Sequence, residues 1–349
     1  MKKVIDLRSD TVTKPCKKML QAIMNATVGD DYYREDQTTS ELEKYCANYF
    51  CTEAALFIIT GTMANQVALR CHTSPGDEVI ADRYSHIVYY CAAAAADLGK
   101  ISFNILDAKK GIITVNDILT AQSTRYRSNL TSYPKLIWIE NTINHYAGKV
   151  YPLDELKTIN SFSRKNGLKI HMDGARLLNA CVTGGIHPRE YIKYTDSAIF
   201  SFSKALGAPA GSILLGKKNF INCARMYQKW YGGGLHQSGI LASSCLFAIQ
   251  NNLNQISKDH ENAKLLAKLS TKSIAEDILV DSPETNIVMF DLGKLRTPSE
   301  AFISLAKERG VLLYKWSNSI VRAVTHQDIS ETDIFAAAQV INQIFKSEI

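Results

Sequence analysis

An aspartate and a lysine, each at the end of an apolar run, are the residues whose types and spacing best suit chemistry. Asp173 ends the run LKIHMD, and Lys204 follows the run SAIFSFS and precedes a glycine-rich turn. Pyridoxal phosphate needs a lysine amine to form a Schiff base and a carboxylate to keep its pyridine nitrogen protonated. Each residue alone is typical of an ordinary exposed loop. Together, at the carboxyl ends of two predicted parallel strands, they indicate a site for this cofactor.

A glycine between two threonines marks a candidate phosphate site. Gly61 and Thr62 follow the strand-like run AALFIIT and open a helix predicted over 61–72. Exposed N–H groups at a helix start bind phosphate, and glycine lets the backbone approach the anion. The signal is weak alone, because many turns of α/β proteins contain these residues. The chain has no G-x-G-x-x-G pattern, which argues against a dinucleotide site.

Three further polar residues lie where they could contact a ring or a carboxylate. His86 follows the strand-like run EVIAD and could stack on a pyridine ring, although a histidine satisfied within a surface loop is the alternative. Arg176 closely follows Asp173, and Arg322 lies on a predicted C-terminal strand. Guanidinium groups bind carboxylates bidentately, and an amino-acid substrate presents one. For Arg322 the alternative is a surface ion pair.

Short apolar runs alternate with helical patterns from residue 54 to about 216. This alternation predicts an α/β fold with a mostly parallel sheet covered by helices on both faces. After Gly234 the pattern changes to one or two long helices over 238–275, a small α/β unit and a terminal helix. We expect a large domain over 1–250, with segment 1–15 contributing to the site, and a small C-terminal domain over 251–349. The strand candidates of the large domain are 54–60, 78–83, 101–106, 135–140, 168–173, 197–203 and 211–216.

The composition excludes several classes of protein. The chain has 349 residues, 46% of them hydrophobic, which supports a sizeable core. No apolar run could span a membrane and no signal peptide is present, so we expect a cytoplasmic protein. The net charge of +6 comes from interspersed charges of both signs, which argues against nucleic-acid binding. The eight cysteines lack metal-ligand spacing, so we expect reduced thiols and no metal site.

Nearly the whole chain resembles the low-specificity threonine aldolases, within the β-eliminating lyase branch of the fold-type I pyridoxal-phosphate enzymes. The pair HMDGAR (171–176) and SKALGAPAGS (203–212) is its most specific part. The resemblance implies the fold of the fold-type I enzymes. It also implies the aldol cleavage of a β-hydroxy-α-amino acid (threonine, allo-threonine or a bulkier analogue) to glycine and an aldehyde. Further matching segments are IDLRSDTVT (5–13), VGDDYYREDQT (28–38), EAALFIITGTMAN (53–65), ENTINHYAGKVYPL (140–153), GGGLHQSGILA (232–242) and VRAVTHQDIS (321–330).

The resemblance implies roles for individual residues at the cofactor. Lys204 is expected to form the Schiff base, Asp173 to partner the pyridine nitrogen and His86 to stack on the ring. These three are the catalytic candidates. Gly61 and Thr62 are expected to bind the phosphate.

A second group of roles concerns the substrate and the neighbouring subunit. The resemblance implies that Ser9, Arg176 and Arg322 hold the substrate carboxylate, with Arg176 also near the cofactor. Members of the family are usually dimers of dimers with shared sites. The residues expected to reach a neighbour's cofactor or substrate are Tyr33, Lys229 and His236.

The chain departs from the family's pattern around the expected pocket. Ile143 stands where the family has a histidine near the substrate hydroxyl, and Cys91 where a glutamate usually follows the stacking histidine. His236 stands where the glycine-rich loop usually carries arginine. Arg34 and Gln37 replace a usual glycine and proline.

Ile143 bears most directly on the expected mechanism, because it cannot remove the proton of the β-hydroxyl. His86, His145 or an ordered water would then have to accept that proton. As a substrate-binding residue, Ile143 is expected to present an apolar wall that favours a phenyl-bearing β-hydroxy amino acid over threonine. On this interpretation, Ile143→His would raise threonine cleavage.

Two other functions remain open. A transferase with the same core could pass the glycyl carbanion to another aldehyde, or catalyse a different β-substitution, which product analysis with a second aldehyde would detect. A non-enzymatic α/β protein that binds anions or nucleotides would lack a visible absorption band that depends on Lys204.

Overall fold

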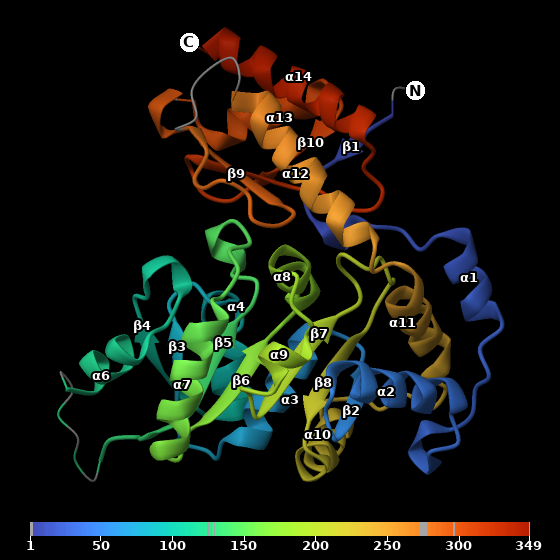
Figure 1. Ribbon diagram of the computed structural model, residues 1–349, viewed down its shortest axis with the longest axis vertical. Helices are drawn as coiled ribbons and strands as arrows, with labels where there is room; N and C mark the ends of the chain where they lie inside the picture. The colour runs from blue at the N-terminus through green and yellow to red at the C-terminus, as the bar shows by residue number, and fades with distance from the viewer. Residues whose placement is uncertain are drawn as a thin grey trace.

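A larger lower part built around one sheet and a smaller upper part make up the chain, and both termini lie in the upper part (Figure 1). This computed structural model describes residues 3–123, 126, 128, 130–271, 278–295 and 297–348. The end of the predicted helical stretch, 272–275, lies outside them. None of the described helices combines the length and apolar character needed to span a membrane.

The large sheet has seven strands in the order β2-β8-β7-β6-β5-β3-β4. Strands β3 to β7 are parallel to one another, and β8 runs antiparallel to both of its neighbours. The predicted mostly parallel sheet is therefore confirmed. The strands are β2 (Ala54–Ile58), β3 (Glu78–Asp82), β4 (Ser102–Leu106), β5 (Pro134–Glu140), β6 (Lys169–Asp173), β7 (Ser197–Ser201) and β8 (Ser212–Gly216).

Helices cover both faces of this sheet, which explains why its strands read as nearly continuous apolar runs. One face packs against α2, α7, α8 and α11, and the other against α3 and α10 (Figure 1). The helices of the lower part are α1 (Lys17–Met24), α2 (Gln37–Phe50), α3 (Gly61–His72), α4 (His86–Tyr89), α5 (Ala92–Ala94), α6 (Val115–Ser123), α7 (Leu153–Lys165), α8 (Leu177–Gly184), α9 (Arg189–Ile192), α10 (Lys218–Trp230) and α11 (Gly239–Asn251).

The upper part has its own core and two small sheets, the antiparallel β11-β12-β9 and the parallel pair β1-β10. Because β1 pairs with β10, Ile5 and Leu7 pack in the upper core, although the predicted division assigned them to the large domain. Its elements are β1 (Ile5–Asp6), β9 (Ile287–Asp291), β10 (Val311–Leu312), β11 (Tyr314–Lys315), β12 (Ile320–Val324), α12 (Gln255–Thr271), α13 (Ser299–Glu308) and α14 (Glu331–Glu348).

Helix α12 leads from one part to the other. Ile256 at its start packs in the lower core, whereas Ala263 and Leu266 pack in the upper core. The change of core thus falls inside α12, and the boundary at residue 250 stays a prediction.

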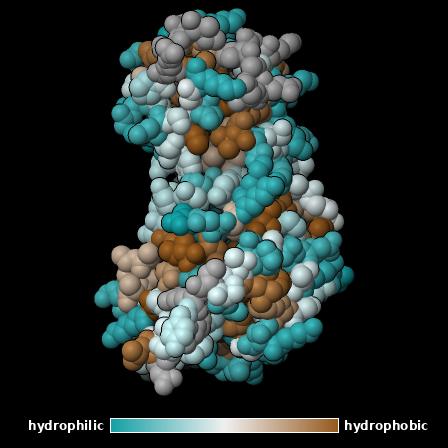
Figure 2. Space-filling model, turned by 90° about the vertical axis from the view of Figure 1, so that its left-hand side faces the viewer, coloured by the Kyte–Doolittle hydropathy of each residue, from teal (hydrophilic) through white to brown (hydrophobic). Residues whose placement is uncertain are grey.

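The carboxyl ends of the parallel strands point to the junction between the two parts. Strands β5, β6 and β7 end in Glu140, Asp173 and Ser201, and Glu140 is the register partner of Asp173. The N-terminal segment crosses the same edge after β1, through a short turn of 3₁₀-helix at Asp10–Val12. Seen from the side, the molecule narrows between its lower and upper parts (Figure 2).

Candidate active site

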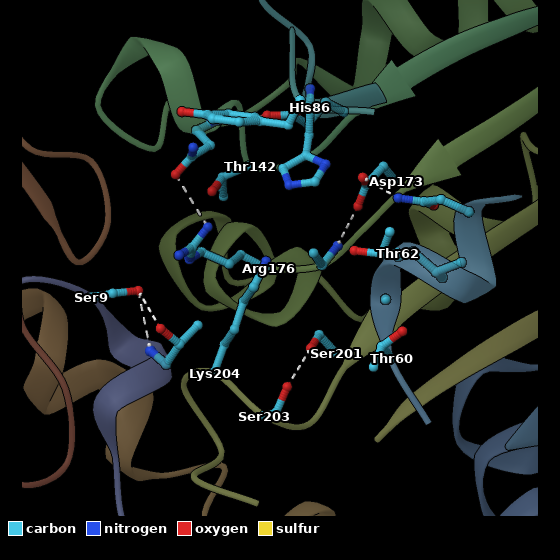
Figure 3. Close-up of a pocket in the computed structure, with 18 of the residues that line it drawn as sticks. Ser9, Thr60, Thr62, His86, Thr142, Asp173, Arg176, Ser201, Ser203 and Lys204 are labelled. Carbon is cyan, nitrogen blue, oxygen red and sulfur yellow. Dashed lines mark hydrogen bonds between the residues drawn. The ribbon is translucent and has the colours of Figure 1, made fainter. Parts of the chain in front are cut away.

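A pocket of about 510 Å³ lies at the carboxyl ends of β5, β6 and β7. Side chains from both parts of the chain line it, and Figure 3 shows Ser9, His86, Asp173, Arg176 and Lys204 around it. It brings together eight of the residues expected at the site from sequence. These are Ser9, Gly61, Thr62, His86, Asp173, Arg176, Lys204 and Arg322.

Asp173 ends β6 and its side chain is held from two sides. Oδ2 accepts a hydrogen bond from Asn65 Nδ2 at 2.7 Å, and Oδ1 accepts one from the Ala175 backbone N–H at 3.1 Å. The following residue, Gly174, allows a close turn, because a Cβ there would lie 2.6 Å from the Ile199 carbonyl oxygen. The carboxylate is therefore fixed at the pocket edge with lone pairs left to accept another proton donor.

Lys204 follows β7, and its side chain extends into the pocket toward Arg176 (Figure 3). Burial and the nearby Arg176 guanidinium lower the pKa of Lys204 to about 8, although Asp10 and Asp173 oppose this shift. A lysine whose pKa falls this far supplies a neutral amine near physiological pH.

Backbone and hydroxyl donors gather at the start of α3. Thr60 precedes the helix, and its Oγ1 accepts a hydrogen bond from the Met63 N–H at 3.1 Å. The hydroxyls of Ser201 and Ser203 are hydrogen-bonded at 3.2 Å and line the same pocket (Figure 3). Free N–H groups at a helix start, combined with hydroxyls, suit a phosphate.

His86 lies on the side of the pocket opposite Ser201 and Ser203 (Figure 3). Its backbone N–H donates to Glu140 Oε2 at 2.6 Å, and its Nδ1 lies 3.5 Å from Cys91 Sγ. Burial lowers the pKa of His86, although the Asp173 carboxylate opposes this. The imidazole is therefore mainly neutral at pH 7 and can accept a proton.

Two arginines share one amide oxygen at the end of the pocket nearest the upper part. Arg176 donates from Nε and Nη2 to the two oxygens of Asp10, each at 2.7 Å. Asn144 Oδ1 accepts from Arg176 Nη1 at 3.3 Å and from Arg322 Nη1 at 3.2 Å. Arg322 Nη2 also donates to the Arg8 carbonyl oxygen at 3.2 Å.

This arginine cluster carries two positive charges against the single negative charge of Asp10. Burial and Arg176 lower the pKa of Arg322 to about 10, because the charged form is desolvated beside a like charge. The rings of Tyr314 and Trp316 each lie 4.8 Å from its guanidinium carbon and hold it in place. A bound carboxylate would balance the cluster, so this end of the pocket suits an organic anion.

Comparison with known proteins agrees with this geometry. The family model of the β-eliminating lyases matches residues 6–294. The chain belongs to the β-eliminating lyase family. It is 38% identical over 336 residues to the low specificity L-threonine aldolase of Escherichia coli K12, covering 96% of this chain and 97% of that one. It is 33% identical to the probable low-specificity L-threonine aldolase 2 of Arabidopsis thaliana, covering 99% and 98%.

A solved structure of similar fold is that of Leishmania major threonine aldolase, with a TM-score of 0.82 and 21% identity over 98% of this chain and 99% of that chain. β-Eliminating lyases and threonine aldolases depend on pyridoxal phosphate. The pocket fits this cofactor, because it combines a lysine amine of lowered pKa, a carboxylate with spare lone pairs and a helix start with hydroxyls.

Ile143 does not form a wall of the pocket, which corrects the interpretation drawn from sequence. Its side chain is 2% exposed and packs in the large core. A Cβ built on Gly111 would lie 2.7 Å from Ile143 Cγ2. The neighbouring residues Thr142 and Asn144 line the pocket instead. Sequence could not reveal this, because a loop residue has no fixed alternation of inward and outward directions.

Three residues expected near a neighbouring subunit's site lie away from this pocket. Tyr33 is 68% exposed. The Lys229 Nζ lies 4.1 Å from the centre of the Tyr32 ring, and His236 Nδ1 is 2.9 Å from Asp30 Oδ2. Their expected contact with another subunit stays a prediction.

Several residues of the pocket were missed from sequence. Glu140 ends a predicted strand in the same way as Asp173, and that signal could have found it. Ser201 and Ser203 alternate ahead of Lys204, which also places them on one side of the chain. The others carry no local signal, because the fold brings them in from separate elements. The missed residues are Asn65, Tyr90, Glu140, Asn144, Ser201, Ser203, Tyr314 and Trp316.

Proposed function

We propose that the protein cleaves a β-hydroxy-α-amino acid, either threonine or a bulkier analogue, to glycine and an aldehyde. The observation that carries this proposal is that Asp173, Lys204 and a two-arginine cluster line the same pocket. When bound, pyridoxal phosphate supplies an electron-withdrawing ring that stabilises negative charge at the substrate Cα. Asp173 would keep the ring nitrogen protonated, and the Lys204 amine would bond to the aldehyde carbon. The start of α3 would bind the phosphate.

The substrate carboxylate is assigned to the arginine cluster. Arg176 and Arg322 approach Asn144 Oδ1 from two sides, and their remaining N–H groups can hold a carboxylate in a fixed direction. Ser9 lines the same end of the pocket. Fixing the carboxylate fixes rotation about the bond from Cα to nitrogen, so the bond from Cα to Cβ can be set for cleavage.

His86 is the proposed acceptor of the β-hydroxyl proton. It lines the pocket, and burial favours its neutral form. His145 is less suited, because its ring stacks on Tyr84 at 4.0 Å between centroids and it does not line the pocket. His86→Phe keeps a flat ring but no acceptor, and should lower kcat about 10²–10⁴-fold while cofactor stays bound.

The β-substituent is assigned to an aromatic side of the pocket formed by Tyr90, Tyr314 and Trp316. Burial of a phenyl group against these rings would favour it over the methyl group of threonine. The preference expected from sequence is therefore kept, with a different set of residues.

Product analysis tests the proposed function. The wild-type protein with cofactor should release equal amounts of glycine and aldehyde from threonine and from a phenyl-bearing β-hydroxy amino acid, with a higher kcat/KM for the second. Absence of glycine from both substrates would contradict the proposal. A new β-hydroxy amino acid formed with an added second aldehyde, without free glycine, would instead favour the transferase.

The proposed assembly is a homo-oligomer, a dimer or a dimer of dimers, in the cytoplasm. Exposed apolar side chains on α1, α10, α11 and the loop before α2 support it, because such groups favour burial between subunits. All eight cysteines are free thiols, which fits a reducing compartment. The residues of this surface are Leu20, Met24, Tyr32, Tyr33, Met226, Trp230 and Ile240.

A further inference from the structure

Glu140 is a buried carboxylate of the pocket that none of the roles above uses. It ends β5 with 8% of its surface exposed. Oε2 accepts a hydrogen bond from the His86 backbone N–H at 2.6 Å, and Oε1 accepts one from the Asn144 backbone N–H at 2.8 Å. One side chain therefore ties together the segment after β3 and the segment after β5.

These two segments carry the two halves of the site. The first places the His86 ring over the pocket (Figure 3). The second places Asn144 Oδ1 between the guanidinium groups of Arg176 and Arg322. A shift of Glu140 would therefore move the proton acceptor and the carboxylate-binding cluster relative to each other.

The charge on Glu140 is set by the same surroundings. Burial and the neighbouring Asp173 carboxylate raise the pKa of Glu140 to about 7, while the two N–H donors and Lys204 oppose the shift. A protonated ring nitrogen held by Asp173 would reduce the repulsion between the two carboxylates and favour the ionised form of Glu140. Both oxygens already accept backbone N–H groups, so the geometry suits positioning better than proton transfer.

We propose that Glu140 is a positioning residue whose ionised carboxylate holds the histidine over the ring in register with the two-arginine site for the substrate carboxylate. This inference rests on the proposed function for the identity of the ligands. It adds a physical coupling, because a carboxylate bound at the arginines orders Asn144, and Glu140 transmits that order to His86.

Glu140→Gln is the test variant. The amide keeps one acceptor oxygen and turns its NH₂ group toward a backbone N–H, so one of the two hydrogen bonds is lost. Glu140→Asp keeps the charge but is too short to reach both segments. Glu78→Gln is the matched control: Glu78 is a fully buried glutamate at the opposite end of the same sheet, where it accepts from Asn104 Nδ2 at 3.0 Å.

Glycine is the first probe, because it presents the carboxylate and the amine but has no bond from Cα to Cβ. Its affinity for the cofactor-loaded protein is read from the change in cofactor absorbance. We expect Glu140→Gln to weaken glycine binding about ten- to a hundredfold, as for loss of a hydrogen bond to a charged group. Glu140→Asp should fall between it and the wild type, and Glu78→Gln should bind glycine normally at a lower Tm. Wild-type glycine affinity in Glu140→Gln would overturn the proposal.

Hydrogen exchange in the presence of acetate gives a readout that needs neither cofactor nor turnover. In the wild type, acetate should protect the backbone amides of both Asn144 and His86. In Glu140→Gln it should protect at most the Asn144 segment. Equal protection of both segments in the variant would overturn the coupling. A protein that shows this coupling but releases no glycine from β-hydroxy amino acids would refute the proposed function alone.

Discussion

At the residue scale, the amine of Lys204 is prepared by its surroundings. Burial and Arg176 lower its pKa to about 8, so about a tenth of the amine is neutral at pH 7, against less than about a thousandth at the ordinary lysine pKa. The cationic cluster that suits a substrate carboxylate therefore also helps to release the proton of the lysine.

Cys91 offers a pH-dependent test of His86. Cys91 Sγ lies beside His86 Nδ1 as a neutral partner, because burial raises the pKa of the thiol. In Cys91→Glu, a carboxylate beside Nδ1 would stabilise the charged imidazole and raise the pKa of His86. A proton acceptor works in its neutral form, so the acidic limb of kcat/KM should move to higher pH. Cys91→Ser should leave it in place. An unmoved limb in Cys91→Glu would mean that His86 is not the acceptor.

Ile143 should matter for stability and not for substrate choice. Because it packs in the large core, Ile143→Ala should lower the free energy of unfolding by about 2–5 kcal/mol and Ile143→Val by about 0.5–1.5 kcal/mol. The ratio of kcat/KM for the phenyl-bearing substrate and threonine should change little. Urea unfolding and kinetics on both substrates measure this. A changed ratio at unchanged stability would mean that Ile143 lines the pocket.

At the element scale, the strands of the large sheet were predictable because burial on both faces leaves long apolar runs, as in the fully buried β7. Asp173 and Lys204 were predictable because each follows such a run. The antiparallel direction of β8 was not predictable, because an apolar run does not indicate in which direction a strand runs relative to its neighbours. Asn144 was missed because its role depends on Arg176 and Arg322, which reach it from other elements.

The N-terminal segment is tied to the large sheet by the buried pair of Asp10 and Arg176. We expect Asp10→Asn to cost about 3–5 kcal/mol of unfolding free energy, because Arg176 is left buried without its partner, and to raise KM. Breaking the partly exposed pair of Lys110 and Asp281 with Asp281→Asn should cost at most about 1 kcal/mol.

The pH dependence of this pair has a defined sign. Burial alone would raise the pKa of Asp10, but the Arg176 guanidinium holds it well below its usual range. The stability that the carboxylate contributes is therefore full above its unfolded pKa of about 4 and is lost as pH falls through the acid range. Urea unfolding should show that the free energies of unfolding of the wild type and Asp10→Asn differ by a constant amount near neutral pH. This difference should shrink below about pH 4. A difference independent of pH would contradict this account.

At the scale of the whole molecule, the exposed apolar surface of the lower part predicts that the active protein is an oligomer. Trp230 and Met24 are 68% and 77% exposed, and replacing both with serine should shift the protein toward monomer and reduce activity. Sedimentation velocity at several concentrations, combined with activity assays, measures this. A fully active monomer would contradict the assembly.

The most direct test of the central claim is the absorption spectrum of the protein with pyridoxal phosphate. The wild type should show a visible band from cofactor bound to Lys204, and Lys204→Ala should lose both this band and glycine release. Lys169→Ala is the control, because Lys169 is an exposed lysine that pairs with Asp196 at the start of β6, and it should keep both. A Lys204→Ala protein with the wild-type band and turnover would contradict the account.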